Sequence, residues 1–167
     1  MKNIYKHVIS IAVFISLTVY LFNPVFFENK GIKQHDIEQW KYSANETIEF
    51  RKKNNDEALW SNSMFSGMPA YLIDVKWSNQ VVFYIHKAYS LFFPHPVSNI
   101  IISFLSFYIM LLCFKVRPEI ALFGSIAFTL SSYMVIGISA GHNARIGTAA
   151  LLPLIIGGVH LLSLIHI

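Results

Sequence analysis

The sequence has few of the features on which soluble enzymes and disulfide-rich proteins depend. Only 13% of its 167 residues are charged, about half the fraction typical of a soluble domain. Its single cysteine, Cys113, excludes an intrachain disulfide and has none of the spacing of a metal site. No glycine-rich phosphate loop, nucleophile elbow or Cys–His metal motif is present, which excludes the usual soluble nucleotide-binding and hydrolase chemistries.

Apolar residues are abundant instead. They make up 54% of the chain, and its mean hydropathy is +0.50, which indicates a membrane protein. The net charge of +4 is compatible with nucleic-acid binding. However, the basic residues lie beside apolar runs or in a mixed-charge loop and do not gather on one soluble face. We therefore expect a lipid bilayer as partner and no nucleic acid.

The apolar runs predict four membrane-spanning helices. The first, residues 8–27, is long for a signal peptide and no A-x-A-like cleavage site follows it, so an uncleaved anchor is favoured over a cleaved signal. Pro118 precedes the third run and suits a first helical turn. The three later spans are predicted over residues 97–114, 119–139 and 146–161.

Polar segments separate these runs. The longest, residues 28–80, contains a helical pattern at about 37–53. Residues 81–96 suggest an interfacial helix followed by a proline-rich turn, with a re-entrant segment as the alternative. Short polar segments cover residues 1–7, 115–118 and 140–145. The predicted fold is an all-α, multispanning helical membrane protein with a long, partly helical extracytoplasmic loop.

Basic residues near the runs predict the orientation. With four spans, one membrane side holds Lys2, Lys6, Lys115 and Arg117, whereas the short connection on the other side holds only Arg145. The positive-inside rule therefore makes the N-terminus cytoplasmic. The long loop and residues 140–145 then lie together outside the cytoplasm.

Asp36 has two interpretations. It precedes the helical pattern and, with Gln39, fits a capping box, so it could cap the helix. A carboxylate beside a membrane span could equally bind a divalent metal or accept a proton from a hydroxyl group. The neighbouring His35 could act as a ligand or proton relay, or could be a solvated loop histidine.

A second polar set lies at the start of the predicted fourth span. His142, Asn143 and Arg145 follow Gly141, where the N–H groups of a helix N-terminus favour an anion. The Arg145 guanidinium has a geometry suited to phosphate. The alternative is an interfacial anchor in which Arg145 extends to lipid headgroups.

Several short motifs occur together in this order. They are Gln34-His35-Asp36 with Trp40, Leu59-Trp60, Phe65-Ser66-Gly67-Met68-Pro69-Ala70-Tyr71 and Ala140-Gly141-His142-Asn143-Ala144-Arg145. With them, the chain resembles the YfhO-like membrane proteins of Bacteroidetes-type bacteria, from its first span to about Leu161.

The resemblance implies a GT-C-type glycosyltransferase of the bacterial inner membrane. Such an enzyme takes a sugar from a polyprenyl-phosphate carrier and transfers it to an envelope glycan, glycolipid or protein. Asp36 occupies the place of the family's acidic residue in the first extracytoplasmic loop and becomes the expected catalytic residue, or the ligand of a divalent metal if one is used. Charge and topology make His142, Asn143 and Arg145 candidates for the carrier phosphate. Accessory roles are expected for His35, Ser66 and Gly67.

Two other functions remain open: a transporter or flippase for lipid-linked envelope precursors, and a non-catalytic assembly protein. YfhO-like proteins are several times longer, so we interpret this chain as an N-terminal fragment that is inactive alone. Residues 162–167 match a translated transposon-end sequencing adapter, and we expect the native sequence to stop near Leu161, which shortens the fourth span.

Overall fold

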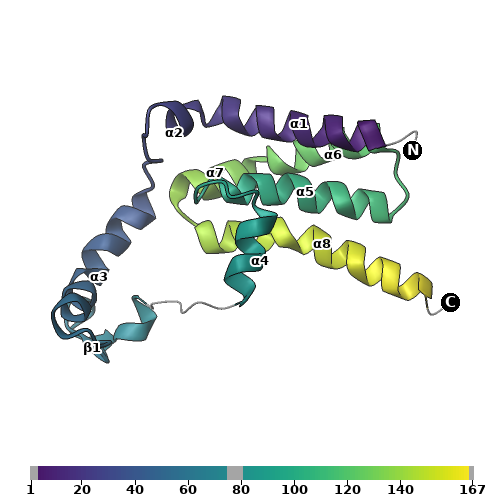
Figure 1. Ribbon diagram of the computed structural model, residues 1–167. Coiled ribbons are helices and arrows are strands. Elements are labelled where there is room, and N and C mark those ends of the chain that lie inside the picture. Colours follow the sequence, from purple (N-terminus) through teal and green to yellow (C-terminus); the bar gives the residue numbers. More distant parts are fainter. Residues whose placement is uncertain (1–3, 75–80, 166–167) are drawn as a thin grey trace.

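The computed structural model describes residues 4–74 and 81–165, and helices predominate throughout (Figure 1). Five helices form a bundle: α1 (Ile4–Leu21), α5 (Ser98–Cys113), α6 (Pro118–Thr129), α7 (Ser132–Ala140) and α8 (Asn143–Ile165). The chain reverses direction between α1 and α5, between α5 and α6, and between α7 and α8. The segments between α1 and α5 and between α7 and α8 consequently lie at the same end of the bundle.

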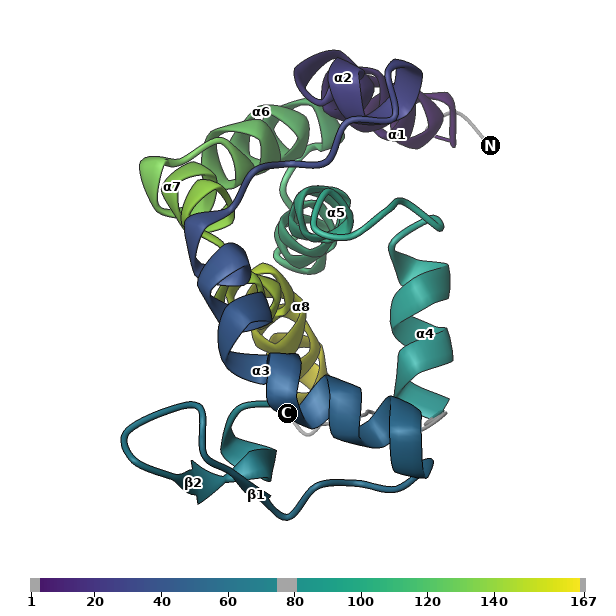
Figure 2. The same ribbon diagram turned by 90° about the vertical axis from the view of Figure 1, so that its left-hand side faces the viewer.

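Helix α5 is the centre of the bundle. It packs against α8, α6 and α1, and Figure 2 shows it end-on between them. The core includes stacked rings of Phe14 and Phe104, whose centroids are 4.8 Å apart. Hydrogen bonds join polar side chains inside the bundle, for example Thr129 Oγ1, which donates to Ser103 Oγ at 3.0 Å. Such hydrogen bonds between helices are typical of membrane bundles.

Two helices, α1 and α8, are long and apolar enough to span a membrane. The pair α6–α7 gives a third candidate if it counts as one bent span, and α5 is apolar but shorter, with 16 residues. Large apolar side chains such as Ile9, Phe123 and Ile155 point away from the bundle. An outer surface of this kind suits lipid better than water.

The third apolar run is not the single helix expected over residues 119–139. Pro118 does open α6, as predicted, but the run breaks after Thr129 and bends by 42° into α7. Ser131 adopts an extended backbone conformation at the start of α7, which interrupts the helical hydrogen bonds. The segment predicted as the third span is therefore made of two helices joined at a bend.

The other runs differ from prediction at their ends. The first, expected over residues 8–27, divides into α1 and the short helix α2 (Asn23–Phe27), because Pro24 lacks the N–H that would continue α1. The second agrees within one residue at each end. The fourth begins at Asn143 rather than near residue 146 and reaches Ile165.

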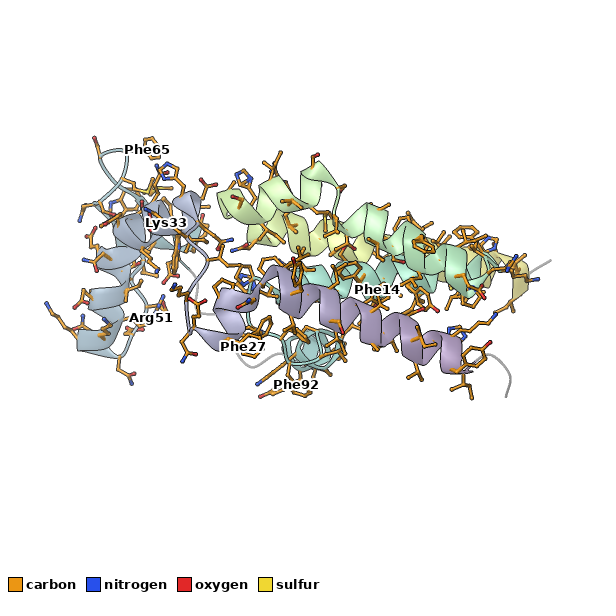
Figure 3. All side chains as sticks on the ribbon, turned by 90° about the horizontal axis from the view of Figure 1, so that it is seen from above. Phe14, Phe27, Lys33, Arg51, Phe65 and Phe92 are labelled. Carbon is orange, nitrogen blue, oxygen red and sulfur yellow. The ribbon has the colours of Figure 1, made fainter. Side chains whose placement is uncertain are left out.

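The long polar segment forms a small unit beyond the end of the bundle. Its main element is α3 (His35–Asn54), which confirms the predicted helix and extends it slightly at both ends. Two short antiparallel strands, β1 (Trp60–Ser61) and β2 (Met68–Pro69), lead into the 3-10 turn η1 (Ala70–Leu72). In Figure 3, Arg51 and Phe65 lie on this unit, whereas Phe14 lies within the bundle.

Helix α4 (Val81–Tyr89) lies beside the bundle and runs across the direction of α5 (Figure 2). The Tyr89 hydroxyl lies 3.2 Å from Ser106 Oγ of α5. Burial of the Tyr89 side chain raises the pKa of its hydroxyl. Within residues 81–96, where an interfacial helix followed directly by a proline-rich turn was expected, the helix already ends at Tyr89. Leu91 and Phe92 have φ values of 52° and 60°, which are incompatible with a right-handed helix.

Candidate functional site

Asp36 and His142 meet at the polar end of the bundle. His142 Nε2 lies 2.9 Å from Asp36 Oδ2, and the side chains are 37% and 47% exposed, respectively. Asp36 comes from the first turn of α3, and His142 comes from the turn between α7 and α8. The two polar sets singled out in the sequence are therefore brought together, and within residues 4–74 and 81–165 no hydrogen bond is made to the second Asp36 oxygen.

Asp36 is not the cap of α3, so that interpretation was wrong. The N-cap position belongs to Gln34, and no side chain makes a capping hydrogen bond there. The expected capping box is also not formed, because the Gln39 amide nitrogen lies 3.0 Å from His35 Nε2. Helix α3 begins at His35, about two residues earlier than expected, so Asp36 lies inside the first turn and faces the α7–α8 turn instead.

A buried cluster of amides lies next to this pair, because Gln34 and Asn143 are close in sequence to Asp36 and His142. Gln34 and Asn143 exchange two hydrogen bonds, Nε2 to Oδ1 at 2.9 Å and Nδ2 to Oε1 at 3.0 Å, across 109 residues of sequence. Gln34 Nε2 also donates to the backbone oxygen of Ile138. Asn99 of α5 donates to the backbone oxygen of Asn143 at 3.1 Å. The cluster ties α3, α5 and the α7–α8 turn together, and we name these three residues, Gln34, Asn99 and Asn143, the amide clamp.

Gly141 allows the close approach of α3 to the α7–α8 turn. It ends α7 with φ of 103°, a left-handed conformation that favours glycine. A Cβ atom at this position would lie 3.2 Å from the Asp36 Cβ and 3.3 Å from the Gln34 Cβ. The glycine therefore serves the geometry of the Asp36–His142 pair, both through its backbone and through its lack of a side chain.

Asn143 and Arg145 have different surroundings. The Asn143 side chain is only 8% exposed and is engaged by Gln34, so its visible role is structural. Arg145 is exposed in the first turn of α8, and its guanidinium carbon lies 5.6 Å from the centroid of the Tyr133 ring. Arg145 is thus held on the outer side of the turn, close to the partially positive N-terminus of α8.

The accessory residues expected from the sequence lie further away. His35 is exposed and contacts Gln39, as described above. Ser66 and Gly67 lie in a left-handed turn, where a Cβ on Gly67 would come within 2.6 Å of the Trp60 indole nitrogen. The glycine of the Gly-Met-Pro motif is therefore explained by packing against Trp60.

The next residue, Met68, contributes to a groove beside Asp36. The groove has a volume of about 280 Å³ and lies between α3 and the segment that follows β1. Trp40 is fixed at its edge, because its indole nitrogen donates to the backbone oxygen of Ile73 at 2.9 Å. The lining residues are Asp36, Gln39, Trp40, Ser43, Met64, Met68, Leu72 and Ile73.

Hydrogen bonds to Glu46 hold the far wall of the groove against α3. Its carboxylate accepts from Ser61 Oγ at 2.9 Å and from the backbone N–H of Asn62 at 2.8 Å. The bond from Ser61, followed by those from Asn62, holds the pKa of Glu46 below its ordinary value. Arg51 adds a second anchor by pairing with Glu57 and Asp74, which raises the guanidinium pKa further.

A divalent metal would find few protein ligands here. Among residues 4–74 and 81–165, no group of three or more His, Cys, Asp or Glu side chains is placed to hold an ion. Asp36 supplies one carboxylate, and the nearest second donor, His142, already faces it. Mg²⁺ is commonly held by one or two carboxylates together with substrate phosphates, so Asp36 fits that role only with ligands from a substrate.

The sequence alone indicated no role for three residues of this region: Gln34, Asn99 and Ser43. Asn99 could have been found, because an amide inside an apolar run needs a partner. Gln34 and Ser43 offered no comparable signal.

The chain matches no protein-family model, no curated protein and no solved structure.

Proposed function

We propose that this chain is the N-terminal part of a membrane glycosyltransferase of GT-C type. In this proposal, four spans place the N-terminus in the cytoplasm and the Asp36–His142 pair at the opposite, extracytoplasmic face of the bacterial inner membrane. The substrate is a sugar on a polyprenyl-phosphate carrier, and the acceptor is an envelope glycan, glycolipid or protein. The observation that carries the proposal is the 2.9 Å contact between Asp36 and His142, with Arg145 in the following helical turn.

Asp36 acts as the general base. As the acceptor oxygen forms its bond to the anomeric carbon of the sugar, the hydroxyl proton passes to Oδ1 of Asp36, the oxygen that does not face His142. The bond between that carbon and the phosphate oxygen breaks, and the carrier phosphate leaves with the electron pair. His142 Nε2 lies 2.9 Å from the other Asp36 oxygen, and this contact limits the orientations open to the carboxylate.

Positive groups lie where a leaving phosphate gains charge. Arg145 and the N-terminus of α8, which carries partial positive charge, lie in the same short segment as His142. Prearranged donors of this kind stabilise developing charge in a transition state. In this proposal Asp36 lies between two binding regions. The carrier phosphate binds at the first turn of α8, and the acceptor binds in the groove.

The test is made in the longer protein encoded by the uninterrupted gene. Membranes containing it are assayed for transfer of a radiolabelled sugar from a polyprenyl phosphate. Asp36→Asn removes the base and is expected to slow transfer by roughly 10²- to 10⁴-fold. Glu38→Gln, a neutralised carboxylate in the same turn of α3, is the matched control and should keep the wild-type rate. Transfer by Asp36→Asn at the control rate would refute the catalytic role.

One observation favours a second candidate, a transporter or flippase for a lipid-linked precursor. The third apolar run is broken and bent by 42° between α6 and α7. Interrupted spans often line the substrate path of transporters. Movement of a fluorescent polyprenyl-linked sugar across vesicles containing the longer protein, without transfer to any acceptor, would favour this candidate over the transferase.

A further inference from the structure

The groove beside Asp36 has one polar wall and one apolar wall. Asp36, Gln39 and Ser43 lie at helical spacing along one face of α3, with Trp40 on the same face. The opposite wall consists of apolar side chains from the segment after β1. They are Met64, Met68, Leu72 and Ile73. A ligand in this groove meets hydrogen-bonding groups on one side and hydrocarbon on the other.

Trp40 gives the groove a rigid aromatic edge. Its indole nitrogen is already bonded to Ile73, which holds the ring in place. The remaining indole surface offers a flat apolar area, and the side chain is 39% exposed. Asp36 and Gln39 contribute acceptor oxygens next to this ring, and the Ser43 hydroxyl can accept a further hydrogen bond.

We propose that this groove binds a single pyranose ring, the terminal sugar of a saccharide acceptor. A sugar ring has apolar C–H faces and a polar rim of hydroxyls, so it matches one aromatic edge, one apolar wall and one polar stripe. The volume of about 280 Å³ is at the low end for ligand sites and suits one ring rather than an extended lipid chain. The assignment to the acceptor rests on the proposed transferase function.

The position of Asp36 explains why the ring belongs to the acceptor. One carboxylate oxygen faces His142, on the side of the α8 N-terminus, while the residue also lines the groove. A hydroxyl of a ring in the groove would lie next to the base that removes its proton. The carrier phosphate would lie across Asp36, near Arg145.

The proposal is tested by saturation-transfer NMR on the 167-residue chain in lipid nanodiscs. The probes are the methyl glycosides of glucose, galactose, mannose and N-acetylglucosamine, with farnesyl phosphate as a short polyprenyl phosphate in a separate arm. Ser43→Phe fills the groove from α3 and keeps the Trp40–Ile73 bond, whereas Trp40→Ala removes the aromatic edge. Tyr42→Ala, on the same helix and 82% exposed outside the groove, is the matched control. Circular dichroism establishes that each variant is folded.

At least one glycoside should receive saturation in its ring protons. We expect Trp40→Ala to lower that binding by roughly threefold to tenfold, and Ser43→Phe to abolish it, with Tyr42→Ala unchanged. Three results would overturn the proposal: no glycoside binds, glycoside binding persists in Ser43→Phe, or farnesyl phosphate alone shows binding that Ser43→Phe removes. If glycosides bind in the groove but the longer protein transfers no sugar, the transferase proposal fails and the sugar site stands.

Discussion

The amide clamp makes a quantitative prediction about stability. Gln34 Nε2 donates to Ile138 O and to Asn143 Oδ1, and Gln34 Oε1 accepts from Asn143 Nδ2. Gln34→Leu removes these three hydrogen bonds, whose net contribution is about 0.5–1.5 kcal/mol each, or about 1.5–4.5 kcal/mol in total. Asn143→Leu removes two of the three and keeps the Asn99 bond to its backbone oxygen, which gives about 1–3 kcal/mol.

The double variant separates this explanation from general damage. Because both single changes remove the same two bonds, the double variant should cost about as much as Gln34→Leu alone. The sum of the single effects should then exceed the double effect by about 1–3 kcal/mol. The free energy of unfolding is measured by titrating the chain in mild-detergent micelles with dodecyl sulfate and following helix content by circular dichroism.

The control is Gln39→Leu, which removes an exposed amide from the same helix and should change the free energy of unfolding by about 0.5 kcal/mol or less. Additive effects of Gln34→Leu and Asn143→Leu, within about 0.5 kcal/mol, would show that the two amides do not depend on each other. That result would refute the clamp as the link between α3 and the α7–α8 turn.

Three further predictions concern the same end of the molecule. Gly141→Ala strains a left-handed position and crowds α3, so the chain should lose about 1–3 kcal/mol in the same dodecyl sulfate titration. Gly67→Ala should make the turn more susceptible to limited proteolysis, because the new Cβ atom would clash with the Trp60 indole. A second change, Trp60→Ala, should restore part of the protease resistance. The pKa of Glu46 is lowered by its hydrogen bond from Ser61, so that contribution to stability is present above the unfolded value near 4.5 and is lost as the pH falls below it. Hydrogen exchange of residues 60–63 should speed up on acidification, and a Glu46→Gln variant should lack that pH dependence.

Much of the bundle could be predicted because apolar runs are a strong, local signal. Span length requires only a count of apolar residues, and the helix at 35–54 follows from the helical spacing of Ile37, Trp40, Ala44 and Ile48. The expectation that the segments around Asp36 and His142 lie together needed only the number of chain reversals between them. The observed contact agrees with that expectation.

The break in the third run could not be predicted in the same way. Thr129 and Ser131 are compatible with an apolar helix, and only their surroundings interrupt it. Thr129 donates to Ser103 on the neighbouring α5, and Ser131 adopts an extended conformation. Tertiary contacts of this kind override the weak local preference of a hydroxyl side chain.

Asp36 shows why a residue type alone does not give a role. Aspartate is a good helix cap, and Gln39 follows at the spacing of a capping box, so local reasoning favours a cap. Gln34 lies buried in the amide clamp, which starts α3 early and carries Asp36 into the first turn, facing the α7–α8 turn. A contact across 109 residues thus decides the position of a carboxylate two residues away. Since the clamp fixes where Asp36 points, its loss should weaken any ligand contact of Asp36 even when the carboxylate itself is retained.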